Sequence, residues 1–304
     1  MSKQSMQRIE VSPAVARLAQ AIGRVAQSDG DHATSVPALS LHRRRAPTEP
    51  LHCVYGLGLG VIARGSKQVL LGDEVIEYAP GQSMLTTVDS PVVAHVTRAT
   101  QWEPFLGLFL RLEPRHITQL AAEMELSPRP HERIHRSISV ETLEDALVEA
   151  LIRLVDLLDE SALVASLAPL IQQEITIRLL AGPHGAHLRD LVAAGSPSQQ
   201  IAKAVTWLKR NFKEPVQMNE LAARAHMSPS TFRQHFRVIT GTSPLQFQKQ
   251  LRLQEARQLM FNQSVDASNA SGMVGYESPS QFSREYSRLF GEPPQRDVRR
   301  MRSP

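Results

Sequence analysis

The sequence has little of what stabilises small secreted domains or crosses membranes. It contains 304 residues but only one cysteine, Cys53, which cannot form an intrachain disulfide. No apolar run approaches the roughly 20 residues that span a bilayer. The first residues, MSKQSMQRIEVSP, also lack the uninterrupted apolar stretch and the cleavage site of a secretory signal. We therefore expect a cytoplasmic protein without a membrane segment.

The charge is unevenly distributed along the chain. The net charge is only +4, from 34 Lys and Arg against 30 Asp and Glu. From Gln200 onward there are 16 basic and 8 acidic residues, a net charge of +8, whereas the remainder has 18 against 22 and carries −4. A basic C-terminal part indicates contact with a polyanion, although a solvated arginine-rich surface produces the same count.

At this length we expect two domains. Residues 12–27 repeat apolar positions at helical spacing, and a polar, turn-rich segment that we interpret as a loop follows them. Between residues 51 and 112 the pattern changes to short β-like runs, and Gly72 with Asp73 joins two of them in the manner of a tight hairpin. The pattern predicts an antiparallel sheet or small barrel.

Amphipathic helical stretches follow the predicted strands, at residues 117–126, 143–158 and 163–180. Such helices either pair two copies of the chain into a homodimer or cover an open face of the sheet, and both alternatives stay open here. A segment rich in Gly and Pro then marks a boundary near residue 196. We therefore predict one domain over residues 1–195 and a second over residues 196–304.

The C-terminal part contains an internal repeat. Two segments, MSPSTFRQHFRVITGTSP (227–244) and ESPSQFSREYSRLFGEPP (277–294), align without gaps at an offset of 50 residues. Each copy has a Ser that can cap a helix, a Pro at the first helical position and a Gly at the helix end. A short helix and a sharp turn precede each copy, so we predict two helix-turn-helix units, at about 218–240 and 266–290.

The two repeated helices are predicted to have one buried and one exposed face. The buried faces carry apolar side chains at i, i+4 and i+7, namely Phe232, Phe236 and Ile239, and Phe282, Tyr286 and Leu289. The opposite faces carry side chains that bind base edges and phosphates, because Arg pairs with guanine and Gln with adenine. We predict contacts with double-stranded DNA from Ser230, Arg233, Gln234, Arg237, Ser280, Gln281, Arg284 and Arg288.

A continuous helix is predicted between the two units, at residues 244–262. Its 19 residues correspond to roughly 28 Å at 1.5 Å per residue. Successive major-groove faces on one side of B-DNA recur about every 34 Å. A helix of this length would hold two recognition helices about one DNA turn apart in a single chain.

At these residues the sequence resembles the AraC/XylS family of transcriptional regulators, over roughly residues 199–300. The N-terminal stretches APTEPLHCVY, VLLGDEVIEYAPGQ and VDSPVVAHV resemble the sensor domain of one branch of that family. The resemblance implies an α+β protein, with a cupin-like antiparallel β-barrel and a helical pair, then an all-α domain in which a linker helix joins two helix-turn-helix units. It also implies a sequence-specific, effector-responsive regulator of bacterial promoters, an activator that contacts RNA polymerase or a repressor, with no enzymatic activity and no cofactor.

The sequence departs from that family pattern in both units. His226 stands at the turn of the first unit, where the family usually has Gly, and we expect it in a left-handed conformation. In the second unit, Asn269 and Ser271 replace the usual Glu and Ala, and Gly272 lies within the helix at a cost of about 1 kcal/mol. We therefore predict that the first unit contributes more to DNA affinity than the second.

Two other functional classes need to be weighed. The segment His131-Glu132-Arg133-Ile134-His135 has the HExxH spacing of a zinc hydrolase. Two prolines precede it and no third ligand follows at a familiar spacing, so we expect no metal site. A general nucleic-acid-binding protein would share the basic charge but bind all sequences about equally, whereas a regulator should prefer its own site by roughly 10³ or more.

The effector site is poorly defined by the sequence. Cys53, next to His52, is either a reactive sensor thiol or a buried core cysteine. Arg64, Lys67 and His95 are pocket candidates only because they lie in the strand region. The run Arg43 to Arg45 either touches an anion or forms a solvated loop, and we favour the loop.

Overall fold

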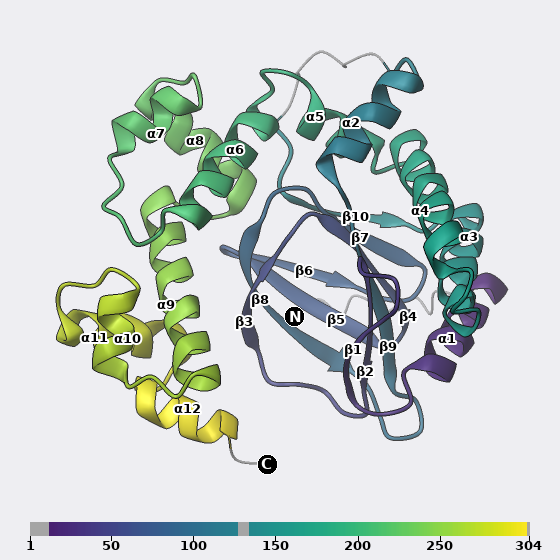
Figure 1. Ribbon diagram of the computed structural model, residues 1–304, viewed down its shortest axis with the longest axis horizontal. Helices are drawn as coiled ribbons and strands as arrows, with labels where there is room; N and C mark the ends of the chain where they lie inside the picture. The colour runs from purple at the N-terminus through teal and green to yellow at the C-terminus, as the bar shows by residue number, and fades with distance from the viewer. Residues whose placement is uncertain (1–11, 127–133, 303–304) are drawn as a thin grey trace, which may run out of the picture.

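The computed structural model describes residues 12–126 and 134–302 (Figure 1). The strands of the N-terminal part form two antiparallel sheets, one in the order β1-β2-β9-β4-β7-β10 and one in the order β3-β8-β5-β6. Their bounds are β1 (Gly30–Ala33), β2 (Leu39–Arg44), β3 (Leu51–Tyr55), β4 (Gly58–Arg64), β5 (Ser66–Leu71), β6 (Glu74–Tyr78), β7 (Gln82–Thr86), β8 (Ser90–Arg98), β9 (Phe105–Arg111) and β10 (Ile138–Thr142).

The predicted antiparallel β domain is confirmed, with two differences. The strands do not close into a barrel, because each ladder stays within its own sheet. The polar segment after residues 12–27, which we interpreted as a loop, contains β1 and β2. Leu39 and Leu41 are buried there, and β2 pairs along its whole length with β9. The predicted hairpin is present: Leu71 pairs with Glu74, and Gly72 in the turn has φ +61°.

Helices cover the outer face of the six-stranded sheet (Figure 1). Helix α1 (Pro13–Val25) packs against β4 and β9, and its cap is Ser12, whose Oγ accepts a hydrogen bond from the Val15 amide. Helix α3 (Asp145–Asp156) lies between α1 and α4 (Val164–Ala181). The short helices η1 (Leu157–Asp159), α2 (Pro114–Glu123) and α5 (Gly185–Val192) complete this layer.

The C-terminal part is entirely helical and has two hydrophobic cores. Its helices are α6 (Pro197–Arg210), α7 (Met218–Arg224), α8 (Pro229–Thr240), α9 (Pro244–Asn262), α10 (Ala267–Met273), α11 (Pro279–Phe290) and α12 (Pro294–Arg302). The first core joins α6, α7, α8 and the start of α9, and the second joins the rest of α9 to α10, α11 and α12. Within the described ranges, no helix is both long and apolar enough to cross a membrane.

The two parts of the chain contact each other directly. Gly72, in the β5–β6 turn, lies against Gly241, where a Cβ on Gly72 would be 2.2 Å from the Gly241 carbonyl oxygen. The amide of Ser137 donates to the Ile239 carbonyl over 2.9 Å. On the four-stranded sheet, the His52 ring meets that of Phe290 at 5.3 Å. The β domain therefore rests on the ends of both α8 and α11.

Candidate DNA-binding interface

The repeated helices α8 and α11 begin and end as the sequence predicts. Ser228 Oγ accepts a hydrogen bond from the Thr231 amide over 3.2 Å, and Ser278 Oγ accepts one from the Gln281 amide over 3.3 Å. Both helices end at a left-handed glycine, Gly241 with φ +73° and Gly291 with φ +81°. The second helix lacks a reciprocal capping box, because the Gln281 amide group donates to Glu285 instead.

Aromatic packing holds each helix against its neighbours. In α8, Phe232 and Phe236 are fully buried, and the Phe236 ring meets that of Phe247 on α9 edge to face at 5.5 Å. In α11, Phe282 and Tyr286 are fully buried and their ring centres lie 5.5 Å apart. This packing fixes which face of each helix points outward.

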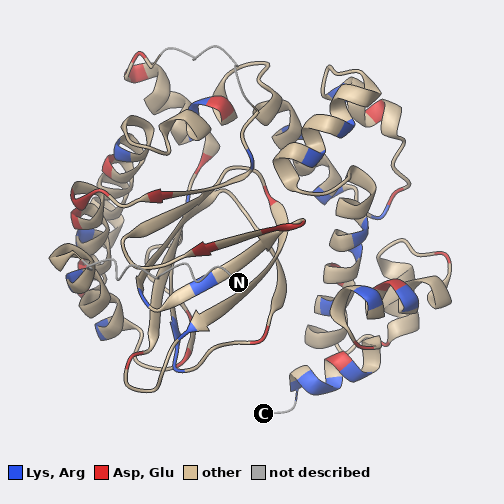
Figure 2. Cartoon of the chain, turned by 180° about the vertical axis from the view of Figure 1, so that it is seen from behind, with Lys and Arg blue, Asp and Glu red and all other residues tan. Residues whose placement is uncertain are grey.

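The outward faces present all the residues that the sequence analysis selected. Ser230, Arg233, Gln234 and Arg237 on α8 are exposed, as are Ser280, Gln281, Arg284 and Arg288 on α11. In the described part of the chain, none of these four arginines forms an ion pair with a carboxylate. In Figure 2, Lys and Arg positions, in blue, lie on α11 and along α12 and α9. The exposed cations can therefore pair with phosphates or base edges without first breaking internal ion pairs.

The turns of the two units use different residues for a left-handed conformation. His226 has φ +51° in the turn between α7 and α8, as expected. The corresponding turn before α11 has Gly275 with φ +86°, and a Cβ there would lie 2.3 Å from the Lys213 carbonyl oxygen. Only glycine fits at the second turn without moving the backbone, so this turn is held close to the loop after α6.

Helix α9 connects the two units as the predicted 19-residue helix. On one side the Arg252 guanidinium donates to the carbonyls of Phe212 over 2.6 Å and of Gly275 over 2.8 Å. The amide of Gln248 donates to Phe212 and to Glu214. These bonds tie the loop after α6 and the second turn to the same helix, which limits rotation of one unit against the other.

A buried ionic network stabilises the second unit. Asp297 on α12 is fully buried and accepts two hydrogen bonds from Arg257 on α9, at 2.7 and 2.8 Å. The Tyr286 hydroxyl of α11 donates to the same carboxylate over 2.7 Å. Burial by itself would raise the pKa of Asp297, but these hydrogen bonds outweigh it and hold the pKa below its ordinary value. The network was not predicted, since nothing in the spacing of these residues pairs them.

The predicted effector candidates lie on three different strands. Cys53 on β3 is partly buried, and burial raises the pKa of its thiol to about 11, although Lys67 acts in the opposite direction. Arg64 lies at a register shift at the end of β4. His95 on β8 has a buried Nδ1 without a hydrogen-bond partner among the described residues. None of the three lines the cavity between the two sheets, whereas Lys67 does.

Most of the HExxH segment lies outside the described residues, namely His131, Glu132 and Arg133. His135 is described: its Nε2 lies 3.3 Å from a carboxylate oxygen of Asp190, and its ring is 4.5 Å from that of His187. Within residues 12–126 and 134–302, no group of three or more His, Cys, Asp or Glu side chains is arranged to hold a metal ion.

Comparisons with known proteins agree with this architecture. The chain matches the family described as AraC-type transcriptional regulator N-terminus over residues 35–187, and a helix-turn-helix domain family over residues 221–300. The regulator CdhR of Pseudomonas aeruginosa is 32% identical over 38% of this chain and 35% of its own length. The activator RclR of Escherichia coli is 39% identical over 24% of this chain and 26% of its own.

The chain thus aligns with only about a quarter to a third of the length of these relatives. Among solved structures, ToxT of Vibrio cholerae superimposes over 86% of this chain and 96% of its own with a TM-score of 0.53, at 10% identity. That likeness shows that the fold extends over both parts. Because the N-terminal family match alone covers half of the sequence, the chain belongs to the AraC-type family of transcriptional regulators.

Proposed function

We propose that this chain is a sequence-specific DNA-binding transcriptional regulator, with residues 196–304 as its DNA-binding domain and residues 1–195 as its sensor. The observation that carries the proposal is the pair of exposed polar faces on α8 and α11, both attached to the single rigid helix α9. A helix of 19 residues spans roughly 28 Å. The two faces would then enter successive major-groove segments of one DNA duplex.

Selection of binding sites from random duplex DNA, followed by footprinting, tests this proposal. The chain should enrich a bipartite site with its halves about 10 base pairs apart. Arg233→Ala should weaken binding to that site by about tenfold or more and relax the preference at one base pair, since a bidentate arginine contributes about 1–3 kcal/mol of discrimination. Arg115→Ala, an exposed arginine on α2, is the matched control. Equal binding to all sequences would favour the general nucleic-acid-binding alternative.

We also propose that a small-molecule effector controls this binding. The β5–β6 hairpin carries Gly72 to the end of the recognition helix α8, and Ser137 bonds to Ile239 in the last turn of the same helix. A ligand that favours one arrangement of the sheets would therefore change how α8 is held. ToxT, which shares the fold, has been solved with an unsaturated fatty acid bound. DNA and effector should then alter each other's affinity by the same factor.

A homodimer formed through α4 is part of the proposal. Leu163, Leu167 and Leu170 are 43, 38 and 60% exposed and lie on one face of the helical stretch. A second copy is the partner that such a face fits best, because the helices α2, α3 and α5 already pack against other parts of α4. Sedimentation equilibrium should show a dimer that Leu170→Lys dissociates, with Leu51→Lys, an exposed leucine on β3, as the control.

The remaining partners follow from the family. We propose that the bound regulator contacts RNA polymerase and acts in the cytoplasm, as an activator. Transcription from a promoter that contains the selected site should rise when the purified chain is added to RNA polymerase. A fall in transcription would identify a repressor instead.

A further inference from the structure

A cavity of about 230 Å³ lies between the two sheets of the N-terminal domain. Residues of both sheets line it, including Tyr55 and Lys67 from the four-stranded sheet and Met84 and Phe105 from the six-stranded sheet. Gly60 contributes to the space, because a Cβ there would lie 3.2 Å from the Tyr78 hydroxyl. The volume lies below the roughly 300–1,000 Å³ of pockets for drug-sized ligands, which suits a small organic molecule rather than a long chain.

Two donors that line this cavity, Lys67 and Tyr55, have no anionic partner in the described ranges. The Lys67 ammonium lies 5.3 Å from the centre of the Tyr55 ring, and no carboxylate in the described ranges forms an ion pair with it. The Tyr55 hydroxyl is buried without a hydrogen-bond partner. Burial lowers the pKa of Lys67 and raises the pKa values of Tyr55 and Tyr78, so both hydroxyls stay protonated as donors.

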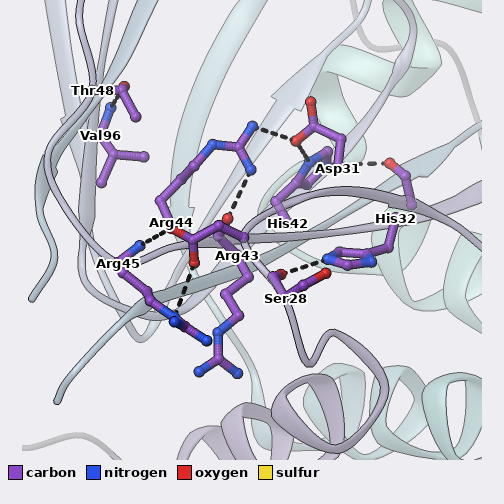
Figure 3. Close-up of polar contacts among 11 residues, drawn as sticks. Ser28, Asp31, His32, His42, Arg43, Arg44, Arg45, Thr48 and Val96 are labelled. Atoms are coloured by element: carbon purple, nitrogen blue, oxygen red, sulfur yellow. Dashed lines mark hydrogen bonds and ion pairs between the residues drawn. The ribbon is translucent and has the colours of Figure 1, made fainter. Parts of the chain in front are cut away.

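Burial lowers the pKa of Lys67, while Cys53 and the Asp31 carboxylate act in the opposite direction, and Asp31 already has two partners. Its carboxylate binds His42 Nδ1 at 2.7 Å and Arg44 Nη2 at 2.6 Å (Figure 3). The Arg44 side chain is only 28% exposed and also donates to the Arg43 carbonyl. Arg43 and Arg44 lie in β2, so our interpretation of the arginine run as a solvated loop was wrong for these two residues, whereas Arg45 follows the strand and is 48% exposed. The Asp31 carboxylate thus pairs with His42 and Arg44 and forms no ion pair with Lys67.

We propose that this cavity binds a small organic carboxylate, whose charged group pairs with Lys67 and accepts a hydrogen bond from Tyr55, while its apolar body lies against Met84 and Phe105. Lys67 is half-buried, and a partly desolvated cation without a partner costs free energy. An anion that enters the cavity would remove that penalty, and the apolar walls would select an organic anion over an inorganic one.

The position of Lys67 connects the cavity to the DNA-binding domain. Lys67 pairs with Tyr78 across the β5–β6 ladder, and the same ladder ends at the Gly72 turn against Gly241. A ligand held by Lys67 therefore stabilises one position of the hairpin that touches α8. In this respect the inference rests on the proposed regulatory function, although binding of the carboxylate does not.

The test uses the full-length chain without DNA and follows its thermal midpoint. Benzoate, salicylate and hexanoate are each compared with the matched amide at constant ionic strength, and palmitate serves as a long-chain probe. A ligand that binds only the folded state raises the midpoint. We expect at least one short carboxylate to raise it at concentrations where its amide does not.

Three variants assign the effect to the cavity. Lys67→Met should weaken carboxylate binding by about tenfold or more and should not lower the midpoint of the ligand-free protein, because the half-buried ammonium has no internal ion pair to lose. Tyr55→Phe should weaken binding by about tenfold. The control Lys203→Met, on the exposed side of α6, should change neither carboxylate binding nor the thermal midpoint. A lysine with a merely structural role would lower the ligand-free midpoint when replaced.

The proposal is overturned if no short carboxylate outperforms its amide, if Lys67→Met retains the response, or if palmitate alone binds. Affinity for the selected DNA site is measured on the same samples by fluorescence anisotropy. Loss of DNA recognition with intact carboxylate binding would refute the proposed function and leave the ligand assignment standing. The opposite pattern would refute only the ligand assignment.

Discussion

The buried carboxylate of Asp297 offers the sharpest test of how the second helix-turn-helix unit is held together. Asp297→Ala removes the partner of Arg257, which is only 8% exposed. An unpaired buried charge of this kind costs about 3–5 kcal/mol. The Tyr286 hydroxyl also loses its acceptor, which adds about 1 kcal/mol. Against a total stability of about 5–15 kcal/mol, the loss is large.

The effect should be confined to one end of the DNA-binding domain. The core around α10, α11 and α12 is separate from the one around α6, α7 and α8. Footprinting should therefore show loss of protection over the half-site read by α11 and retention over the half-site read by α8. Urea unfolding of Asp297→Ala, monitored by circular dichroism, should show that the second core unfolds at a lower urea concentration than in the unmodified chain.

The matched control is Arg300→Ala, which removes an exposed partner of the same carboxylate. Arg300 lies 3.0 Å from Asp297 but its side chain is 54% exposed, so its loss should cost no more than about 1 kcal/mol. If Asp297→Ala destabilises the chain no more than this control does, the buried network does not hold the second unit and the reasoning fails.

The contribution of Asp297 to stability depends on pH in a definite direction. The pKa of Asp297 is lower in the folded chain than its ordinary value of 3.8, so its contribution is present above that pH and is lost as pH falls through the folded value. The stability of the unmodified chain should therefore fall more steeply below pH 4 than that of Asp297→Ala. If the free energy of unfolding falls with pH at the same slope in both proteins, this assignment is contradicted.

Further expectations concern the two reading faces, the turns and the lone thiol. Arg233→Ala should weaken specific binding more than Arg284→Ala in a mobility-shift titration, and the reverse order would refute a dominant first unit. Gly275→Ala should destabilise the chain by about 1–3 kcal/mol through its left-handed backbone, whereas Gly272→Ala, with open space around it, should stabilise it by up to about 1 kcal/mol in urea titrations. Burial raises the pKa of Cys53 to about 11. Iodoacetamide at pH 8 should therefore modify Cys53 at least about tenfold more slowly in the folded chain than in the urea-unfolded chain. Equal rates in the two states would support the alternative that Cys53 is a reactive sensor thiol.

Sequence alone was sufficient where the determinants are local. Ser228, Pro229 and Gly241 define the ends of α8 through capping and backbone preference, and the same three residue types define α11. The two-residue hairpin at Gly72 was predictable because Gly-Asp favours a tight turn, whereas the left-handed turn at His226 was expected from the Gly that the family usually has there. Helical periodicity then determined which faces are exposed.

Only the tertiary structure decided how distant segments meet. Strand β2 is short, with only Leu39 and Leu41 buried, and it forms because β9 offers an edge for pairing, while β1 in turn pairs with β2. Lys67, Tyr55 and Tyr78 come from three strands, and only the packing of two sheets places them around one cavity. Arg257 and Asp297 are 40 residues apart and become partners because α12 folds back on α9. Short-range chemistry thus defined the helices that face DNA, while the cavity, the ionic network and the contacts between domains depend on long-range packing.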